Sequence, residues 1–183
     1  MKKVIGIIGK LCAGKDSVGE YISKKYALPL YSISGKVKSL GEKDHISREG
    51  LINFSRSLSE KFGDGYIAEK IIEDAKENTI IIVGMRQKGQ IKYLKENTQF
   101  LLIAIEASDE IRFLRMQKRN RPGEPESLEE FIRIEKEEDG KSVQKISACI
   151  KQADICLKNE GEIEDLYKKI DTIVKEFIFS KEF

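Results

Sequence analysis

A short segment near the N-terminus, Gly9–Ser17, constrains the fold of this chain more than any other feature of its sequence. It reads Gly-Lys-Leu-Cys-Ala-Gly-Lys-Asp-Ser and fits the pattern G-x-x-x-x-G-K, with Asp16 where serine or threonine is usual. A β-branched run, Val4–Ile8, precedes it, and an amphipathic segment, Lys15–Tyr26, follows it. Between a strand and a helix, such a glycine-rich loop turns successive backbone N–H groups toward one anion. The segment therefore predicts a phosphate-binding loop.

The rest of the chain alternates short apolar runs with amphipathic segments. The runs that we expect to be strands are Lys3–Ile8, Leu28–Ser32, Thr79–Val83, Phe100–Glu106 and Asp154–Leu157. The segments that we expect to be helices are Lys15–Tyr26, Ser47–Phe62, Gly65–Lys76, Ser108–Lys118, Ser127–Glu138 and Glu162–Phe177. Two of the strands are nearly continuous apolar runs, as strands buried on both faces are. The pattern predicts an α/β fold with a doubly wound, parallel, five-stranded sheet.

The length of 183 residues favours a single domain, 1–183. Two connections, Ser34–Glu77 and Ser108–Ala153, are long enough for two or three helices each and are expected to bulge from the core. The first predicts a flap over about 34–77. The second contains a Pro/Gly-rich break, Arg119–Pro125, which predicts a mobile lid over about 119–140.

Composition restricts the partners and the compartment. The net charge is +2, which argues against a dedicated nucleic-acid binder. The three cysteines, Cys12, Cys149 and Cys156, are an odd number and predict no disulfide framework. The apolar run Val4–Ile8 is too short for a signal-peptide core, and no stretch approaches the ~18 apolar residues of a membrane span. We therefore expect a cytoplasmic protein without a membrane partner.

Several reactive side chains are expected to take no part in catalysis or metal binding. Cys12 is interpreted as a small spacer in the loop, and Cys149 and Cys156 as packing residues rather than metal ligands. His45, the only histidine, lies in a polar stretch and is expected to be exposed and inert. The acidic cluster Glu135–Asp139 is interpreted as a solvated helix face.

Beyond the loop, the chain resembles nucleoside-monophosphate-kinase-like P-loop proteins, among them adenylate-kinase-related and dephospho-CoA-kinase-like members. The stretches that carry the resemblance, in the order of the family, are Ile5–Ser17, Ile82–Arg86, Phe100–Ala107, Arg112–Arg121, Ser127–Phe131 and Ala153–Gly161. The resemblance implies transfer of a phosphoryl group from ATP with Mg²⁺ to a small acceptor, such as a nucleoside monophosphate or dephospho-CoA. The oligomeric state is left open.

The motif and the resemblance together nominate the site residues. The residues expected to bind the nucleotide are Gly9, Lys10, Ala13, Gly14, Lys15, Asp16, Ser17, Arg115, Asn159 and Gly161. The residues expected to act in catalysis are Lys15, Arg86, Arg119 and Arg121. Arg86 would hold the acceptor, although a surface arginine is the alternative. A solvated helix face explains Arg115, Arg119 and Arg121 nearly as well.

One departure from the family weakens the prediction of activity. Relatives commonly carry Asp at the end of the third strand, and this chain has Val83 there. Mg²⁺ prefers oxygen ligands, so we expect Asp16 and Ser17 to form the metal site. The alternative for Asp16 is a helix cap, and the alternative function is a nucleotide-dependent switch or partner-binding ATPase with little or no kinase activity.

Overall fold

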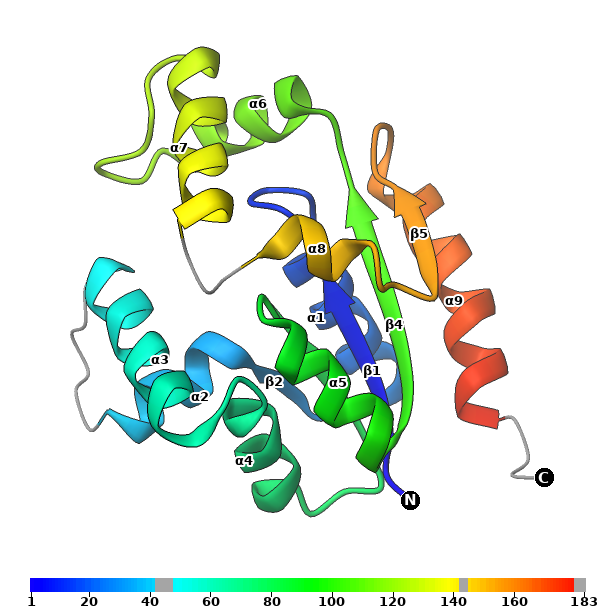
Figure 1. Ribbon diagram of the computed structural model, residues 1–183. Helices are drawn as coiled ribbons and strands as arrows, with labels where there is room; N and C mark the ends of the chain where they lie inside the picture. The colour runs from blue at the N-terminus through cyan, green and yellow to red at the C-terminus, as the bar shows by residue number, and fades with distance from the viewer. Residues whose placement is uncertain (42–47, 142–144, 180–183) are drawn as a thin grey trace.

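The core of the molecule is a parallel sheet of five strands in the order β2-β3-β1-β4-β5 (Figure 1). The computed structural model describes residues 1–41, 48–141 and 145–179. Its strands are β1 (Lys3–Ile8), β2 (Leu30–Ser32), β3 (Thr79–Val83), β4 (Gln99–Glu106) and β5 (Ile155–Lys158). Its helices are α1 (Lys15–Tyr26), α2 (Ile33–Leu40), α3 (Arg48–Phe62), α4 (Tyr66–Asp74), α5 (Lys88–Asn97), α6 (Asp109–Arg119), α7 (Leu128–Lys141), α8 (Ile146–Ile150) and α9 (Ile163–Phe179). The predicted doubly wound parallel sheet is confirmed.

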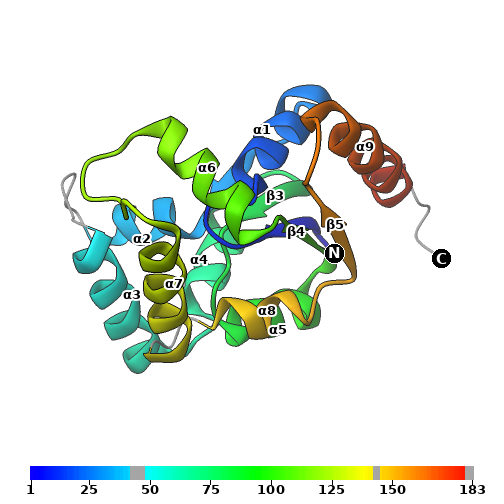
Figure 2. The same ribbon diagram turned by 90° about the horizontal axis from the view of Figure 1, so that it is seen from above.

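Helices cover both faces of the sheet because the side chains of each strand alternate between the two sides. In β1, Val4 and Ile8 join the core beneath α2, α4 and α5, while Ile5 and Ile7 join the core beneath α1 and α9. Viewed from above, α1 and α9 lie on one side of the strands and α4, α5 and α8 on the other (Figure 2). All four of these β1 side chains are fully buried. The sheet therefore rests in apolar surroundings on both faces.

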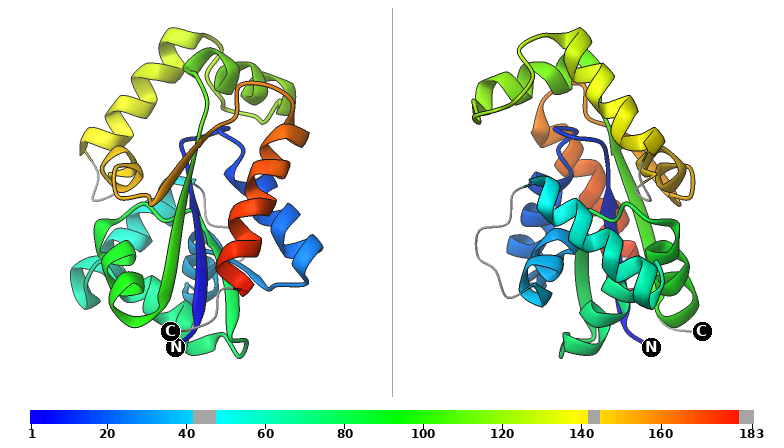
Figure 3. Two further views of the ribbon diagram at one scale, coloured as in Figure 1. Left: turned by 90° about the vertical axis from the view of Figure 1, so that its right-hand side faces the viewer. Right: turned by 60° about the vertical axis from the view of Figure 1, so that its left-hand side comes forward.

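The strand order places the candidate site. β1 pairs in parallel with both β3 and β4, so that Lys3 lies opposite Thr79 on one side and Gln99 on the other. The connections that leave the two sides of β1 run in opposite directions, and ligands of open α/β sheets bind at the carboxyl ends of the strands at such a switch point. The Gly9–Gly14 loop follows β1 at that edge, and α6 and α7 lie beyond it (Figure 3).

A cluster of tyrosine, lysine and aspartate side chains joins the first helix, α1, to the last one, α9. The ring of Tyr21 stacks on that of Tyr167 with the centroids 3.9 Å apart. Asp171 accepts hydrogen bonds from the hydroxyls of Tyr21 and Tyr26, at 2.8 and 3.1 Å, and pairs with Lys25. Burial works against the charge of Asp171, but these three donors outweigh it and lower the pKa of the carboxyl. These contacts hold α9 beside α1, the helix that follows the loop.

The predicted boundaries differ from the observed ones at a few places. β2 begins two residues later than expected because Ala27, at φ 51°, ends α1 and the Leu28 amide donates to the carbonyl of Ser23 in that helix. Helices α2, α5 and α8 were not among the predicted segments. Each of the two long connections holds three helices in the part of the chain that the structure describes: α2, α3 and α4 in the first, α6, α7 and α8 in the second. None of the described helices is both long and apolar enough to cross a membrane.

Candidate active site

The loop after β1 adopts a conformation that depends on its glycines. Gly14 has φ 103°, in the left-handed region that glycine adopts without strain. A Cβ atom on Gly9 would lie 2.5 Å from the carbonyl oxygen of Ile105, so no larger residue fits there. Cys12 has φ 60° without being a glycine, which costs roughly 1–2 kcal/mol and must be compensated by its surroundings. The sequence pattern G-x-x-x-x-G-K thus corresponds to a defined backbone path.

Two buried side chains hold this loop from outside. Asn159, which follows β5 and is 3% exposed, donates its Nδ2 to the carbonyl of Ala13 at 2.9 Å. Arg112, on α6, donates Nη1 to the carbonyl of Leu11 at 3.0 Å. Asn159 was expected near the nucleotide, and it lies against the loop itself. Arg112 was not predicted as a site residue.

Arg112 is the most unusual residue of the site because its side chain is completely buried. Glu135 of α7 accepts from both of its terminal nitrogens, Asp109 pairs with one of them, and the carbonyl of Ala107 accepts from Nε at 3.2 Å. The guanidinium also lies over the ring of Phe131, 5.0 Å from its centroid. Burial opposes its charge, but the hydrogen bonds of the two carboxylates outweigh burial and raise the pKa of Arg112.

Glu135 corrects the interpretation of the acidic cluster. Its side chain is 15% exposed and lies 3.4 Å from the ammonium of Lys10 in addition to its contacts with Arg112. The solvated-face interpretation is wrong for this residue, because a carboxylate that approaches a buried guanidinium stabilises it and is drawn in with it. The ammonium of Lys10 faces Glu135, and nucleotide binding by Lys10 stays a prediction.

A cavity of about 350 Å³ opens beside the loop. The predicted nucleotide-binding residues that line it are Gly14, Lys15, Asp16, Ser17, Arg115 and Asn159. Arg115 donates Nη2 to the carbonyl of Asn159 at 3.0 Å. Its Nη1 is buried and has no hydrogen-bond partner among the described residues, so this donor is unsatisfied there. Gly161 is exposed and does not line this cavity.

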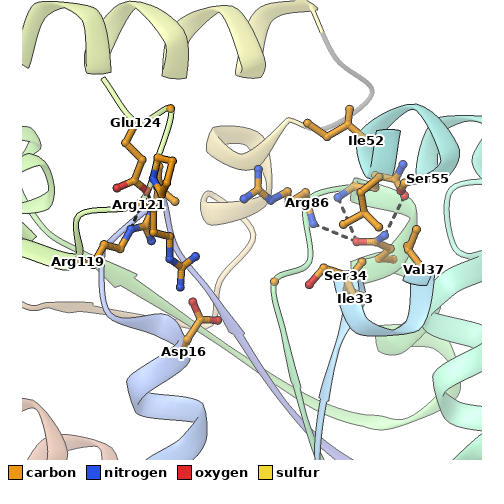
Figure 4. Close-up of a pocket in the computed structure, with 17 residues that line it drawn as sticks. Asp16, Ile33, Ser34, Val37, Ile52, Ser55, Arg86, Arg119, Arg121 and Glu124 are labelled. Atoms are coloured by element: carbon orange, nitrogen blue, oxygen red, sulfur yellow. Dashed lines mark hydrogen bonds and ion pairs between the residues drawn. The ribbon is translucent and has the colours of Figure 1, made fainter. Parts of the chain in front are cut away.

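A larger cavity, of about 560 Å³, lies between α2 and α3 on one side and the segment after α6 on the other (Figure 4). Arg119, Arg121 and Glu124 gather on one side of it above Asp16, and Arg86 lies on the opposite side beside Ser55 (Figure 4). Its apolar lining comes from Leu11, Ile33, Val37, Leu51, Ile52 and Pro122. The cavity thus joins an apolar wall to a rim that carries three arginines and two carboxylates.

The wall beneath Arg86 is a buried hydrogen-bonded network. Gln90 Oε1 accepts from the backbone amides of Arg86 and Gln87, at 3.0 and 3.3 Å. Gln87 Nε2 donates to Ser59 Oγ at 2.7 Å, and Ser59 in turn donates to the carbonyl of Ser55. Gln87, Gln90, Ser55 and Ser59 are all buried. The network fixes the chain after β3 to helix α3.

Arg119 is held by an acidic neighbour. Its Nε donates to Glu124 Oε1 at 2.8 Å, and this bond raises the pKa of Arg119. Burial alone would disfavour the charge on Glu124, but Arg119 outweighs it and lowers the pKa of the carboxyl. The other carboxylate oxygen, Oε2, is buried without a hydrogen-bond partner in the described ranges. A ligand that reaches Arg119 must therefore compete with Glu124 or bind beside it.

The two cavities share one wall, made by Leu11, Asp16 and Arg119. Asp16 is 66% exposed there, and Lys15 donates to it at 2.8 Å. The described residues contain no cluster of three metal-ligating side chains. A Mg²⁺ ion held by one or two carboxylates together with phosphates needs no such cluster. Asp16 and the adjacent Ser17 hydroxyl are oxygen donors that fit such an ion.

The remaining sequence predictions have mixed outcomes. Gly9 and Ala13 shape the loop without lining the smaller cavity. Cys149 is buried in the core, as expected, whereas Cys156 is exposed and donates to Glu106. Burial raises the pKa of Cys12, in keeping with a spacer rather than a nucleophile. His45 lies outside the described residues.

Sequence comparison identifies the relatives of the chain. It is 34% identical over 182 residues to a UPF0200 protein of Methanocaldococcus jannaschii, an alignment that covers 96% of this chain and 90% of that protein. It is 30% identical over 176 residues to a UPF0200 protein of Staphylothermus marinus, with 92% of each chain covered. The chain belongs to the UPF0200 family. No family model matches it. The names of these UPF0200 relatives state no activity.

Comparison with solved structures shows the fold of the UPF0200 chain but not its substrate. A shikimate kinase from Acinetobacter baumannii in complex with shikimate superposes with a TM-score of 0.61 at 16% identity, covering 98% of this chain and 97% of that one. A gluconokinase from Sinorhizobium meliloti gives 0.55 at 12% identity, covering 98% of each. These neighbours are kinases with the same P-loop architecture. The general resemblance to P-loop kinases is confirmed, while membership of the adenylate or dephospho-CoA kinases is not.

Proposed function

We propose that this protein is a P-loop kinase that transfers a phosphoryl group from ATP, with Mg²⁺, to a small acceptor. The observation that carries the proposal is the pair of cavities that meet at Asp16 and Arg119. One cavity begins at a loop suited to phosphate, and the other has cationic groups facing its interior. A phosphoryl donor and an acceptor bound in them would present their reacting ends to the shared wall.

Catalysis would consist of positioning and charge stabilisation, because phosphoryl transfer needs little covalent chemistry from the protein. The loop amides and Lys15 would bind the donor phosphates, and Arg115 would use its buried Nη1 on the nucleotide. Arg119 lines both cavities and would stabilise the transferring group. Mg²⁺, held by Asp16 and the phosphates, would neutralise charge on the donor.

The proposed acceptor is anionic and has an apolar part. Arg86 and Arg121 would bind its negative group, since a guanidinium presents a planar fork of donors to phosphate or carboxylate. Ile33, Val37 and Ile52 would pack against the rest of the molecule. In this proposal the segment 34–77 is the acceptor flap and the segment 119–140 is the lid. The acceptors to be tested first are nucleoside monophosphates and dephospho-CoA.

A coupled assay with a panel of acceptors tests the proposal. The panel contains the four ribonucleoside monophosphates, dephospho-CoA, shikimate and gluconate, the last two taken from the neighbours' names. We expect ADP to form from ATP and Mg²⁺ only when one acceptor is present, and the Lys15→Ala variant to lose this activity. If no acceptor raises ADP formation above the rate with ATP alone, the kinase proposal fails.

The second candidate is a nucleotide-dependent switch, and one observation favours it. The acidic residues that line the larger cavity are Asp16 and Glu124, and Glu124 is already paired with Arg119. Val83 stands where the nucleoside-monophosphate-kinase-like proteins that this chain resembles commonly carry a carboxylate, and it is 4% exposed. Tight ATP binding together with ADP formation that no acceptor accelerates would support the switch over the kinase.

A further inference from the structure

Helix α7 supports the phosphate loop, although it lies far from the loop in the sequence. Glu135 on α7 contacts both Lys10 and Arg112, and Arg112 contacts the carbonyl of Leu11. These contacts join α6 and α7 to two consecutive residues of the loop, Lys10 and Leu11. Sequence separations of 101 residues for Arg112–Leu11 and 23 for Arg112–Glu135 mean that the arrangement exists only in the folded chain.

The bond to the Leu11 carbonyl determines the direction of the next amide. The described chain has no cis peptide bonds, and in a trans peptide the C=O of one residue and the N–H of the next point in opposite directions. Because Arg112 holds the Leu11 carbonyl, the Cys12 N–H must point away from Arg112. Asn159 holds the Ala13 carbonyl in the same manner, which turns the Gly14 N–H away from Asn159.

Both of these amides remain available to a ligand. Within the described ranges, neither the Cys12 nor the Gly14 amide donates to a backbone carbonyl, and both residues line the smaller cavity. Such unpaired N–H groups in a loop with successive right- and left-handed residues form an anion-binding concavity. The φ of 60° at Cys12 also has a cost, so the peptide plane needs an external hold to stay in place.

We propose that Arg112 and Glu135 are positioning residues that set the peptide plane between Leu11 and Cys12, so that the Cys12 amide reaches the phosphates only while α7 is docked. This inference rests on the proposed function to the extent that the loop binds a polyphosphate. It goes further by assigning the anion-binding conformation of the loop to side chains of α6 and α7, which lie outside the loop itself. Asp109 and Phe131 support Arg112 in this arrangement.

The test compares polyphosphate affinity with stability in three variants. Glu135→Gln keeps the shape of the side chain and removes its charge. The double variant Arg112→Met/Glu135→Leu removes one positive and one negative charge, so the net charge stays the same, and a buried pair replaced by apolar residues is often neutral for stability. Glu129→Gln is the control, because it makes the same change at an exposed position of the same helix.

Inorganic tripolyphosphate is the probe, measured by calorimetry beside thermal unfolding and the ATP assay. We expect Glu129→Gln to bind it like the wild type, and Glu135→Gln and the double variant to bind it at least ~10-fold more weakly, while the double variant keeps its unfolding temperature within a few degrees. If the double variant does not fold, Glu135→Gln carries the test alone. Wild-type affinity in the folded variants would overturn the inference.

The failure of the proposed function gives a different result. A wild type that binds tripolyphosphate but transfers nothing from ATP refutes the kinase and leaves the inference standing, since the variants still report on the loop. A wild type that transfers the phosphoryl group while the variants keep full affinity refutes the inference alone. A wild type that does not bind tripolyphosphate refutes the inference, and the acceptor assay then decides the kinase proposal separately.

Discussion

Asp16→Asn separates a metal ligand from a helix cap. The side chain of Asp16 is 66% exposed and pairs with Lys15 at 2.8 Å in the first turn of α1. An exposed pair contributes about 0–1 kcal/mol, and a carboxylate near a helix N-terminus about 0.3–1 kcal/mol. A loss of about 1 kcal/mol lowers the unfolding temperature of a chain of this size by roughly 2–4 °C. We therefore expect a nearly unchanged stability.

The Mg²⁺ requirement should change much more. If Asp16 supplies the carboxylate, its loss should raise the Mg²⁺ concentration at half-saturation of ADP binding by about tenfold or more, which corresponds to about 1.4 kcal/mol. The matched control is Asp165→Asn, because Asp165 lies in the first turn of α9, is 68% exposed and pairs with Lys168 at 3.0 Å. An identical Mg²⁺ titration for wild type and both variants would refute the metal role of Asp16 and favour the switch.

Three further predictions follow from the same structure. Arg86→Ala should raise the KM for the acceptor by at least about tenfold while the calorimetric ATP affinity stays unchanged; a loss of ATP affinity would place Arg86 on the donor side. Limited proteolysis should cut within 119–125 in the free protein and be suppressed by ATP plus acceptor, since closing lids exclude water; ligand-independent cleavage rates would contradict this. Asp171→Asn should lower the unfolding free energy near pH 7 by about 1–3 kcal/mol. Because the folded pKa of Asp171 is lowered, the stabilisation is fully present above the unfolded value of about 4 and is lost as pH falls through the folded value, so the wild type and the variant should converge in acid denaturation curves.

Local patterns were enough to predict the central strands and the loop. β1 and β3 begin and end where expected, since a run of β-branched residues bounded by polar ones has few alternatives. Helix α5 was missed because it is short and highly polar, and the residues that it buries are Gln90, Ile91 and Leu94. Its N-terminus is fixed by the Gln87–Gln90 capping box, which consists of glutamines rather than the usual serine and glutamate.

The site was predictable only where it is local in sequence. The G-x-x-x-x-G-K pattern identified Gly14, Lys15, Asp16 and Ser17 of the smaller cavity, and the resemblance added Arg115 and Asn159. The Pro/Gly-rich break identified part of the larger cavity. In helix α6, Leu114 is 56% exposed, whereas Arg112 and Met116 are buried. A spacing of four residues between Arg112 and Met116 was the available signal. An arginine facing the interior is chosen only by its tertiary partners, here Glu135 and the Leu11 carbonyl.

The central position of β1 in the sheet has a consequence for the order of folding. Its two neighbours pair with it through contacts such as Lys3–Thr79 and Lys3–Gln99, and the side chain that fastens the loop, Asn159, comes still later in the chain. Synthesis at about 5–20 residues per second separates the emergence of Gly14 and Asn159 by roughly 7–30 s. For the first part of that interval, until β3 and β4 have been synthesised, the apolar strand β1 has no partner. The phosphate loop therefore matures among the last parts of the domain, although it is translated before most of them.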